Sequence, residues 1–281
     1  MNTKWIALIL AAVLFLILPA CDNRRKSRRL INGSWVTKSE TRDVGDFKHI
    51  ALSGAGGDLY VKIGNKSELQ IEADDNILPY ISTNVVNETL EVRQVAGVAL
   101  HPRRRIKYFA TVLELESIAC NDWNSNGRII VPDLTGDQFS FSAAASQYCS
   151  LGVLNVSKVL INPGAPGSIY GEFPQEIDIK AVFAKELTVH NHMNKDIYIG
   201  KGRVDHQEVR IKNAGSYKAP NLESTTADVE IIGEGDVEIR VAQTLNVNCV
   251  DFSGNLYYLG DPVITQNRKS ENSGELIRIE E

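Results

Sequence analysis

The chain has 281 residues, of which 43% are hydrophobic and 23% are charged, and it carries a net charge of −5 at pH 7. This balance excludes an intrinsically disordered chain, and the length allows one large domain or two ordinary ones. With three Trp and two Met, the composition argues against a dense aromatic core and favours a repetitive scaffold filled with Val, Ile and Leu.

Residues 1–20 have the pattern of a lipoprotein signal peptide. After the positive charge of Lys4, an unbroken apolar run extends from Trp5 to Leu18, which is shorter than the ~20 residues needed to span a bilayer. The run ends in Leu18-Pro19-Ala20-Cys21, which resembles the lipobox of bacterial lipoproteins, although Pro19 stands where a small residue is usual. The resemblance implies cleavage before Cys21 and lipidation of its thiol. The alternative is an uncleaved anchor or a plain secretory signal.

Residues 21–33 are predicted to form a lipidated basic tether. Five cations follow the lipidation site at Arg24, Arg25, Lys26, Arg28 and Arg29. Each cation gains about 1 kcal/mol near anionic head groups, and a lipid combined with a basic patch gives stable anchoring; a solvated linker is the alternative. When these five cations, Lys4 and Asp22 are left out, 24 of the 30 basic residues and 34 of the 35 acidic residues remain, which gives a net charge of −10. An acidic body does not fit a nucleic-acid partner.

Beyond residue 34, apolar residues that alternate with polar ones predict short β-strands. The clearest stretch is 227–260, where Gly, Asp, Asn and Ser between the strands permit sharp turns. It contains four apolar-x-apolar segments, called apolar steps: Val229–Ile231, Val237–Ile239, Leu245–Val247 and Leu256–Tyr258. They follow one another so closely that no room is left for helices between them.

Similar steps recur through the middle of the chain, and two successive steps make a period of about 20 residues, which is typical of a solenoid whose repeats bury one face only against their neighbours. The predicted fold class is all-β, a parallel β-helix or β-solenoid of short strands, with a β-sandwich as the alternative. We expect one domain over 34–281 and leave open an N-terminal β subregion that ends near residue 100. Asn87-Glu88 has the position of a hairpin tip.

Several of these stretches resemble a known bacterial family. The turn Ser53–Asp58 and the segment Glu72–Tyr80 match its opening, and Gly233–Val237 and Ser253–Pro262 match its close. By these motifs the chain resembles the putative auto-transporter adhesin head domain (GIN domain) family, a domain of unknown function, over about residues 35–281. The family's repeated Ser-Gly turns are replaced here by 142–146, 213–216 and 223–226. The resemblance implies an adhesin-like role.

Two groups of side chains are candidate metal ligands. His190 and His192 lie one residue apart on a predicted strand and, with His206, are a candidate Zn or Cu site. Five polar residues precede apolar steps and are a candidate Ca²⁺ column if the strands stack: Asp58, Asp196, Asp236, Asn255 and Glu275. The preferred interpretations are solvated histidines on a strand and turn-forming side chains. No metal or cofactor is predicted.

Three cysteines lie in the body of the chain, at Cys120, Cys149 and Cys249. Cys249 follows the strand spacing of the residues before it and is expected to face the core. A Cys120–Cys149 disulfide is an open alternative in an oxidising envelope, and an odd number of cysteines cannot all pair within the chain.

The basic stretch 103–105, with Lys107 and Tyr108, is a candidate site for phosphate or an anionic glycan, and a solvated loop is the preferred interpretation. Glu230 and Glu238 lie on neighbouring predicted strands and are the candidate carboxylates of a polysaccharide-cleaving enzyme. The chain has no Gly-x-Ser-x-Gly, His-Glu-x-x-His or phosphate-loop motif. We therefore predict no catalytic residue.

The sequence predicts a non-catalytic lipoprotein of the bacterial cell envelope, periplasm-facing or in the outer membrane. It would contact the membrane through the lipid on Cys21 and the basic tether, and it would bind a glycan or an envelope protein or serve a structural role. A carbohydrate-active β-helix enzyme is the alternative from another class.

Overall fold

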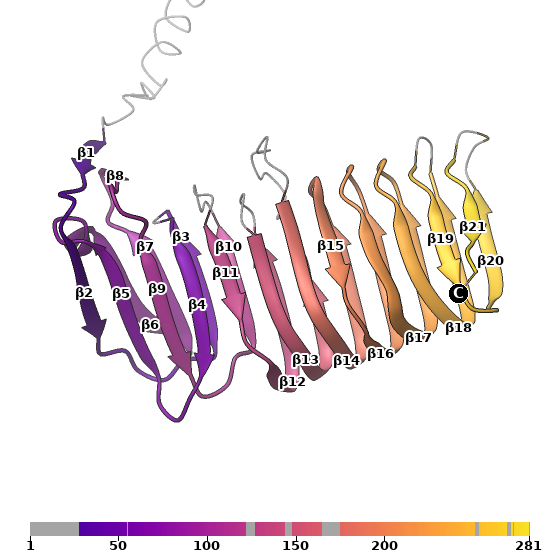
Figure 1. Ribbon diagram of the computed structural model, residues 1–281, viewed down its shortest axis with the longest axis horizontal. Coiled ribbons are helices and arrows are strands. Elements are labelled where there is room, and N and C mark those ends of the chain that lie inside the picture. Colours follow the sequence, from indigo (N-terminus) through magenta and orange to yellow (C-terminus); the bar gives the residue numbers. More distant parts are fainter. Residues whose placement is uncertain are drawn as a thin grey trace, which may run out of the picture.

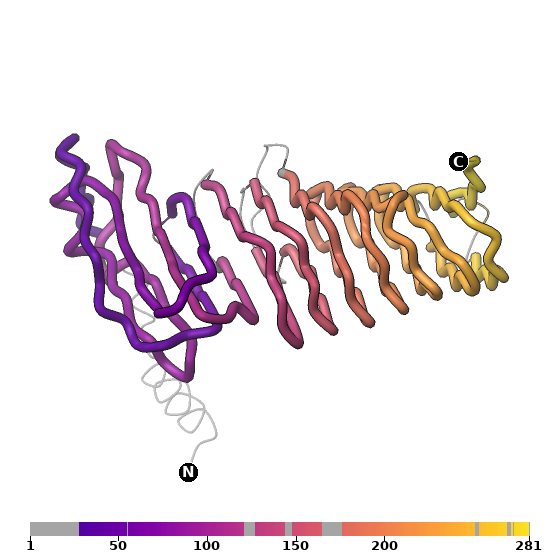
Figure 2. The backbone as a smooth tube through the Cα atoms, turned by 60° about the horizontal axis from the view of Figure 1, so that its bottom comes forward, coloured from indigo at the N-terminus to yellow at the C-terminus, as the bar shows by residue number. Residues whose placement is uncertain are grey.

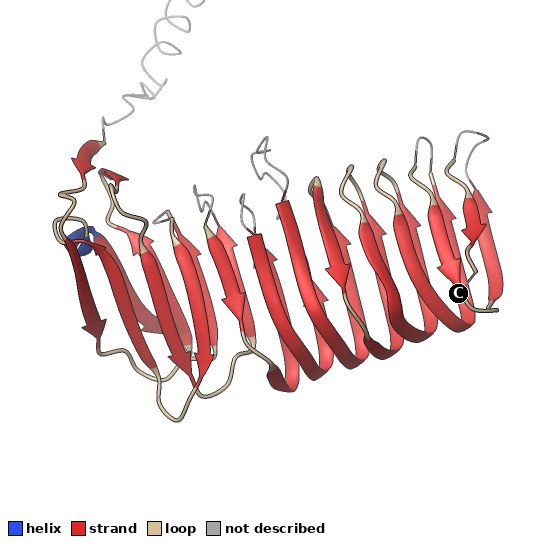
Figure 3. Cartoon of the chain, in the orientation of Figure 1, coloured by secondary structure: helices blue, strands red, loops and turns tan. Residues whose placement is uncertain are grey.

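The computed structural model describes residues 28–54, 56–121, 127–143, 148–164, 175–250, 253–268, 271 and 273–280. The predicted signal peptide, Cys21 and the first part of the tether lie outside these ranges. The described residues are all-β, with a single 3-10 turn, η1 (Leu78–Tyr80), and no α-helix among them (Figure 3). No helix in this described part is long and apolar enough to cross a membrane.

The strands of the N-terminal part are β1 (Arg29–Asn32), β2 (Thr37–Arg42), β3 (His49–Ser53), β4 (Asp58–Ile63), β5 (Glu68–Asp74), β6 (Ile81–Val86), β7 (Thr89–Gln94), β8 (Val98–His101) and β9 (Lys107–Val112). Those of the middle are β10 (Ser117–Asn121), β11 (Arg128–Val131), β12 (Leu134–Ala143), β13 (Tyr148–Ile161) and β14 (Gln175–Asn191). The last are β15 (Lys195–Ile199), β16 (Gly202–Ile211), β17 (Tyr217–Ile231), β18 (Val237–Cys249), β19 (Leu256–Leu259), β20 (Val263–Arg268) and β21 (Leu276–Arg278). All four apolar steps of the 227–260 stretch lie within strands, as predicted.

Most strands belong to two parallel ladders. Ladder A runs, in spatial order, through β7, β3, β10, β12, the ends of β13 and β14, β16, the ends of β17 and β18, and β20. Ladder B runs through β9, β4, β11, the starts of β13 and β14, β15, the starts of β17 and β18, β19 and β21. The chain passes repeatedly from one ladder to the other, so both extend together along the long axis of the molecule (Figure 1, Figure 2).

The register of the ladders repeats at a nearly constant interval. Ladder B aligns Ile177, Ile197, Tyr217 and Val237, which are evenly spaced along the sequence. Ladder A aligns Val189, Val209, Val229 and Val247 at almost the same spacing, with only the last interval slightly shorter. The predicted period of about 20 residues, in the range of solenoid repeats, is therefore confirmed for this part of the chain.

Long strands that bend from one ladder into the other close a ring of pairings. β14 pairs with both β15 and β16, and β17 pairs with the same two strands. These four parallel strands form a closed barrel-like ring, and the remaining described strands lie outside it. The ring exists because β14 and β17 each supply residues to both ladders.

The N-terminal end differs from the expectation of parallel stacking alone. β5 pairs antiparallel with β9 and with β2, and β6 pairs antiparallel with β7. The reversal between β6 and β7 comes from Asn87 and Glu88, which have φ of 49° and 58°. Two left-handed residues match the twist of a two-residue hairpin, so the predicted hairpin tip is confirmed. Beside this end, β1 pairs in parallel with β8 as a separate small sheet.

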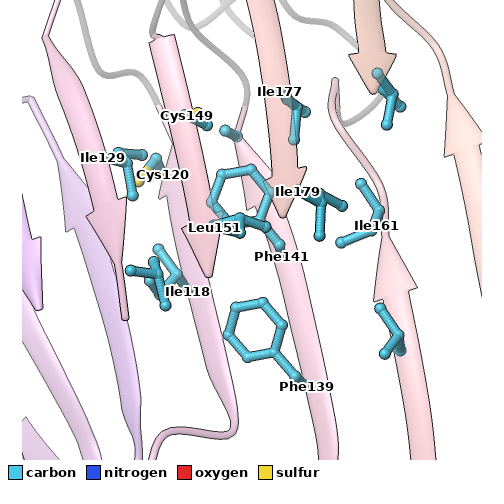
Figure 4. Close-up of a cluster of buried hydrophobic side chains, with 14 of the residues drawn as sticks. Ile118, Cys120, Ile129, Phe139, Phe141, Cys149, Leu151, Ile161, Ile177 and Ile179 are labelled. Carbon is cyan, nitrogen blue, oxygen red and sulfur yellow. The ribbon is translucent and has the colours of Figure 1, made fainter. Parts of the chain in front are cut away.

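The core lies between the two ladders. Inward positions alternate with outward ones along the strands and are filled mainly by buried Val, Ile, Leu and Ala. Figure 4 shows Phe139 and Phe141 of β12, in ladder A, beside Leu151 and Ile179 of ladder B. Full burial of such a side chain contributes roughly 1.5–3 kcal/mol. The outward positions are thereby left free for polar residues, and the candidate site is built from them.

Candidate functional site

Two rows of polar side chains run across the outward face of ladder A near its C-terminal end. The first row contains Thr188, Glu208, Asp228, Asn246 and Thr265, and the second contains His190, Arg210, Glu230, Asn248 and Asn267. Between the rows lies an open groove of about 600 Å³ that crosses β16, β17, β18 and β20. We call this the polar groove. Strand pairing places successive side chains of a row about 4.8 Å apart.

The charges of the polar groove are paired with one another. Arg210 Nε lies 2.5 Å from Glu230 Oε2, and its Nη2 lies 3.7 Å from Glu208 Oε1. His190 Nε2 lies 3.2 Å from the same Glu208 oxygen. Asn248 Nδ2 donates to Glu230 Oε1 at 3.2 Å. Each of these carboxylates therefore has a cationic or amide neighbour on an adjacent strand.

The amides keep hydrogen-bonding capacity for a ligand. Asn246 uses Nδ2 to donate to Asp228 Oδ1 at 2.7 Å, and an amide group has a second N–H and a carbonyl oxygen. Asn246 is exposed, so these groups can reach a ligand, whereas Asn248 is half-buried and its Oδ1 is buried. Donors and acceptors thus alternate across four strands, an arrangement suited to a ligand rich in hydroxyl groups. This surface was missed by the sequence analysis, although the regular spacing of its polar positions along the chain carried the signal.

The two candidate catalytic carboxylates are not brought together. Glu230 belongs to ladder A, where it faces Arg210 and Asn248. Glu238 belongs to ladder B, where it pairs with Lys218 and Tyr257. The hypothesis of a Glu230–Glu238 pair is therefore wrong, because the chain changes ladder between them.

The three candidate histidines do not converge either. The rings of His190 and His192 are 6.3 Å apart, and burial, followed by the nearby Lys212, lowers the pKa of His192. His206 lies four residues before Arg210, the partner of His190 in the ladder, about 13 Å along the strand. Its Nδ1 lies 2.9 Å from Thr226 Oγ1. Among the described residues, no three His, Cys, Asp or Glu side chains are placed to hold a metal ion.

The predicted polar column does line up along ladder B, but its oxygens bind backbone. Four of its five side chains accept a hydrogen bond from an N–H at the start of the neighbouring strand or directly before it: Arg128 to Asp58 (2.9 Å), Ser216 to Asp196 (2.8 Å), Asn255 to Asp236 (2.8 Å) and Glu275 to Asn255 (2.9 Å). These contacts hold neighbouring strands in register. The column therefore has a structural explanation that requires no Ca²⁺.

The cysteines are buried thiols. Cys120, Cys149 and Cys249 are at most 1% exposed, and no disulfide joins Cys120 to Cys149. Burial raises the pKa of Cys149 to about 11 and raises the pKa of the other two thiols as well. Thiols with raised pKa values are poor nucleophiles at neutral pH. The expectation that Cys249 faces the core is confirmed, and the disulfide alternative is wrong.

The basic stretch after β8 is divided by the fold. Lys107 pairs with Glu72 (2.6 Å), Arg105 pairs with Asp58 (3.1 Å) and Tyr108 is buried. Arg103 and Arg104 remain exposed and lie against the ring of Trp35. A single anion site that uses the whole stretch is therefore wrong, and two of its arginines form part of a different surface.

Comparison with protein families gives one clear match. Residues 46–262 match the family described as "Putative auto-transporter adhesin, head GIN domain". Comparison with curated proteins gives no match.

Several solved structures have a similar fold. A putative adhesin from Parabacteroides distasonis ATCC 8503 is 20% identical, with a TM-score of 0.73 over 89% of this chain and 100% of that one. A putative adhesin from Parabacteroides merdae ATCC 43184 is 17% identical, with a TM-score of 0.73 over 90% and 100%. A structure titled putative lipid binding protein, from Parabacteroides distasonis ATCC 8503, is 16% identical, with a TM-score of 0.66 over 90% and 100%. At these identities the similarity shows the fold alone.

Proposed function

This chain belongs to the putative auto-transporter adhesin head GIN domain family, and from that premise we propose a non-catalytic binding role in the bacterial cell envelope. In this proposal, the protein is held to a membrane by a lipid on Cys21 and binds an extended glycan along the polar groove. Its two parallel ladders are interpreted as a β-solenoid, an architecture that presents repeated flat faces to long ligands. The names of the structural relatives, two putative adhesins and a putative lipid binding protein, support a binding role rather than turnover.

One observation carries the glycan assignment: the polar groove repeats similar hydrogen-bonding groups on four adjacent strands. Amides from Asn246 and Asn248 lie beside carboxylates that are already paired. Paired carboxylates accept hydrogen bonds from hydroxyl groups but are poorly suited to act as a nucleophile or a general acid. A chain of sugars would meet donors and acceptors at each strand spacing of about 4.8 Å.

A glycan array and a set of envelope polysaccharides, probed with the purified full-length protein, test this role. Binding and release of product are measured separately. Asn246→Ala with Asn248→Ala is expected to abolish retention, since it removes amide groups from both rows. Asn221→Ala, at an exposed position outside the groove, is the matched control and should retain binding.

Two results would overturn the proposal. Release of product that disappears in Glu230→Gln or Glu238→Gln would establish the carbohydrate-active enzyme instead. Absence of binding and of product release would remove the glycan and leave an envelope protein partner or a structural role, for which crosslinked cells would be examined by pull-down.

The lipid anchor is tested independently. Cys21→Ser should abolish labelling with palmitate and release the protein from membranes. If the variant still sediments with membranes after a high-salt wash, the lipoprotein assignment fails.

A further inference from the structure

An unusually exposed group of apolar side chains lies where the described chain begins. Trp35 is 61% exposed, and Leu30 and Val36 are each 58% exposed. Leu30 lies on β1, and the other two lie between β1 and β2, at the end of the molecule marked by the small β1–β8 sheet (Figure 1). Together with the exposed Arg103 and Arg104, these residues are called the N-terminal patch.

Trp35 is held in this position by its backbone. Its φ is 69°, a left-handed conformation that bulky L-residues rarely adopt. The fully buried Asp74 accepts hydrogen bonds from Trp35 N (2.9 Å), Arg103 N (2.8 Å) and Arg104 N (3.0 Å). Gly33 allows this approach, because a Cβ there would lie 2.2 Å from Asp74 Oδ2. The fold therefore fixes the backbone of Trp35 and of both arginines around one carboxylate, and the three side chains are exposed.

The patch is cationic. The charged groups on and beside it are Arg28, Arg29, Arg103, Arg104, Asp74 and Asp75. The guanidinium carbons of Arg103 and Arg104 lie 5.9 and 5.7 Å from the centroid of the Trp35 ring. Asp75 accepts a hydrogen bond from Ser34 Oγ at 2.5 Å. Four arginines and two aspartates thus give this end of the molecule a positive balance, and two of the arginines lie against the exposed aromatic ring.

We propose that the N-terminal patch docks on the anionic phospholipid head groups of the membrane to which the chain is tethered. This inference rests on the proposed lipid anchor at Cys21. Seven peptide units separate Cys21 from Arg28, and an extended chain of that length spans at most about 25 Å, so the patch stays near the lipid surface. Arginine binds phosphate through its planar fork, and Trp favours the membrane–water interface. Free phosphate would engage the arginines but would leave the apolar side chains in water.

Fluorescence quenching by brominated phospholipids tests the docking. Full-length protein is reconstituted in phosphatidylcholine vesicles with and without phosphatidylglycerol, and the emission of Trp35→Phe is subtracted to isolate Trp35. We expect Trp35 to be quenched in the anionic vesicles and not in the neutral ones. Arg103→Gln with Arg104→Gln should lower the ratio of docked to undocked protein about 25-fold, since each cation contributes about fivefold at an anionic surface. Arg203→Gln, an exposed arginine on β16, is the matched control and should leave quenching unchanged.

The outcomes separate this inference from the anchor. Vesicles that carry the protein without quenching of Trp35 would overturn the docking and leave the anchor intact. Equal quenching in neutral and anionic vesicles, or no effect of the arginine changes, would overturn recognition of anionic head groups. If the protein fails to float with neutral vesicles, the anchor fails. In that case, quenching of Trp35 by added phosphatidylglycerol vesicles would still support docking of the N-terminal patch, and a lack of quenching would refute this docking.

Discussion

Replacing Asp236 with Ala removes one of the side chains that join successive strands of ladder B. In the native fold Asp236 Oδ1 accepts the N–H of Asn255 at 2.8 Å. A hydrogen bond to a charged group contributes about 1.5–3 kcal/mol. Both residues are half-buried, so water replaces part of this contact, and we expect a loss of about 1–2 kcal/mol in the free energy of unfolding. The backbone bond from Tyr217 N to Asp236 O does not involve the side chain and should persist.

Urea titration of Asp236→Ala beside Asp236→Asn measures this contribution. The Asn variant keeps the Oδ1 acceptor, and the structure already uses Asn255 Oδ1 in the same way to accept Glu275 N at 2.9 Å. Asp236→Asn is therefore expected to stay close to the native protein while Asp236→Ala unfolds at lower urea with an unchanged m-value. Equal stability of the two variants would refute the view that these side chains hold the strands together.

Three further changes test the packing between the ladders. Gly235→Ala would bring a Cβ within 2.2 Å of Gly215 O, so urea titration should show a larger loss than for Asp236→Ala, and an equal or smaller loss would contradict this. In Tyr217→Phe the buried Gln207 Oε1 loses its donor at 3.2 Å, and thermal melts should show a loss of about 1–3 kcal/mol in the free energy of unfolding. Adding Gln207→Leu should recover part of this loss, and no recovery would count against the buried hydrogen bond between the two side chains. Burial raises the pKa of Cys149 from 9.0 to about 11, so the folded state keeps a proton that the unfolded thiol releases. The contribution of the protonated thiol to the free energy of unfolding is complete below pH 9 and is lost as the pH rises to 11, a loss of about 3 kcal/mol at most. Cys149→Ala should flatten this decline of stability with pH, and an unchanged pH profile of stability would argue against the raised pKa.

The strands and their period could be predicted because they depend on local pattern. Alternation of Val229, Glu230 and Ile231 decides which side chain enters the core, and an interval of about 20 residues decides which segments pair. The hairpin at Asn87-Glu88 was predictable for the same reason, since two residues suffice for the turn.

The order of strands at the N-terminal end was not predictable in this way. β3 lies between β7 and β10, so the chain adds a pair of strands on one side of β3 before it continues on the other. Nothing in the local pattern distinguishes the two sides, because both expose the same unpaired backbone groups. The polar groove was missed for a different reason: the period of about 20 residues was applied only to the apolar positions. Arg210, Glu230 and Asn248 become neighbours through the same register, and each alone is an ordinary outward polar residue.

The two proposed surfaces lie at opposite ends of one stack of strands. Among the described strands, ladder A runs from β7 to β20 through nine successive pairings, which span about 43 Å at about 4.8 Å each. The N-terminal patch lies beside the β7 end, and the polar groove begins at β16, six pairings away, about 29 Å. Because each pairing adds one strand spacing, the number of strands between the two surfaces sets this separation. In the proposed arrangement, the end near the lipid carries the cations and the exposed indole, and the stack holds the groove of amides clear of the head groups, where a long glycan can reach it.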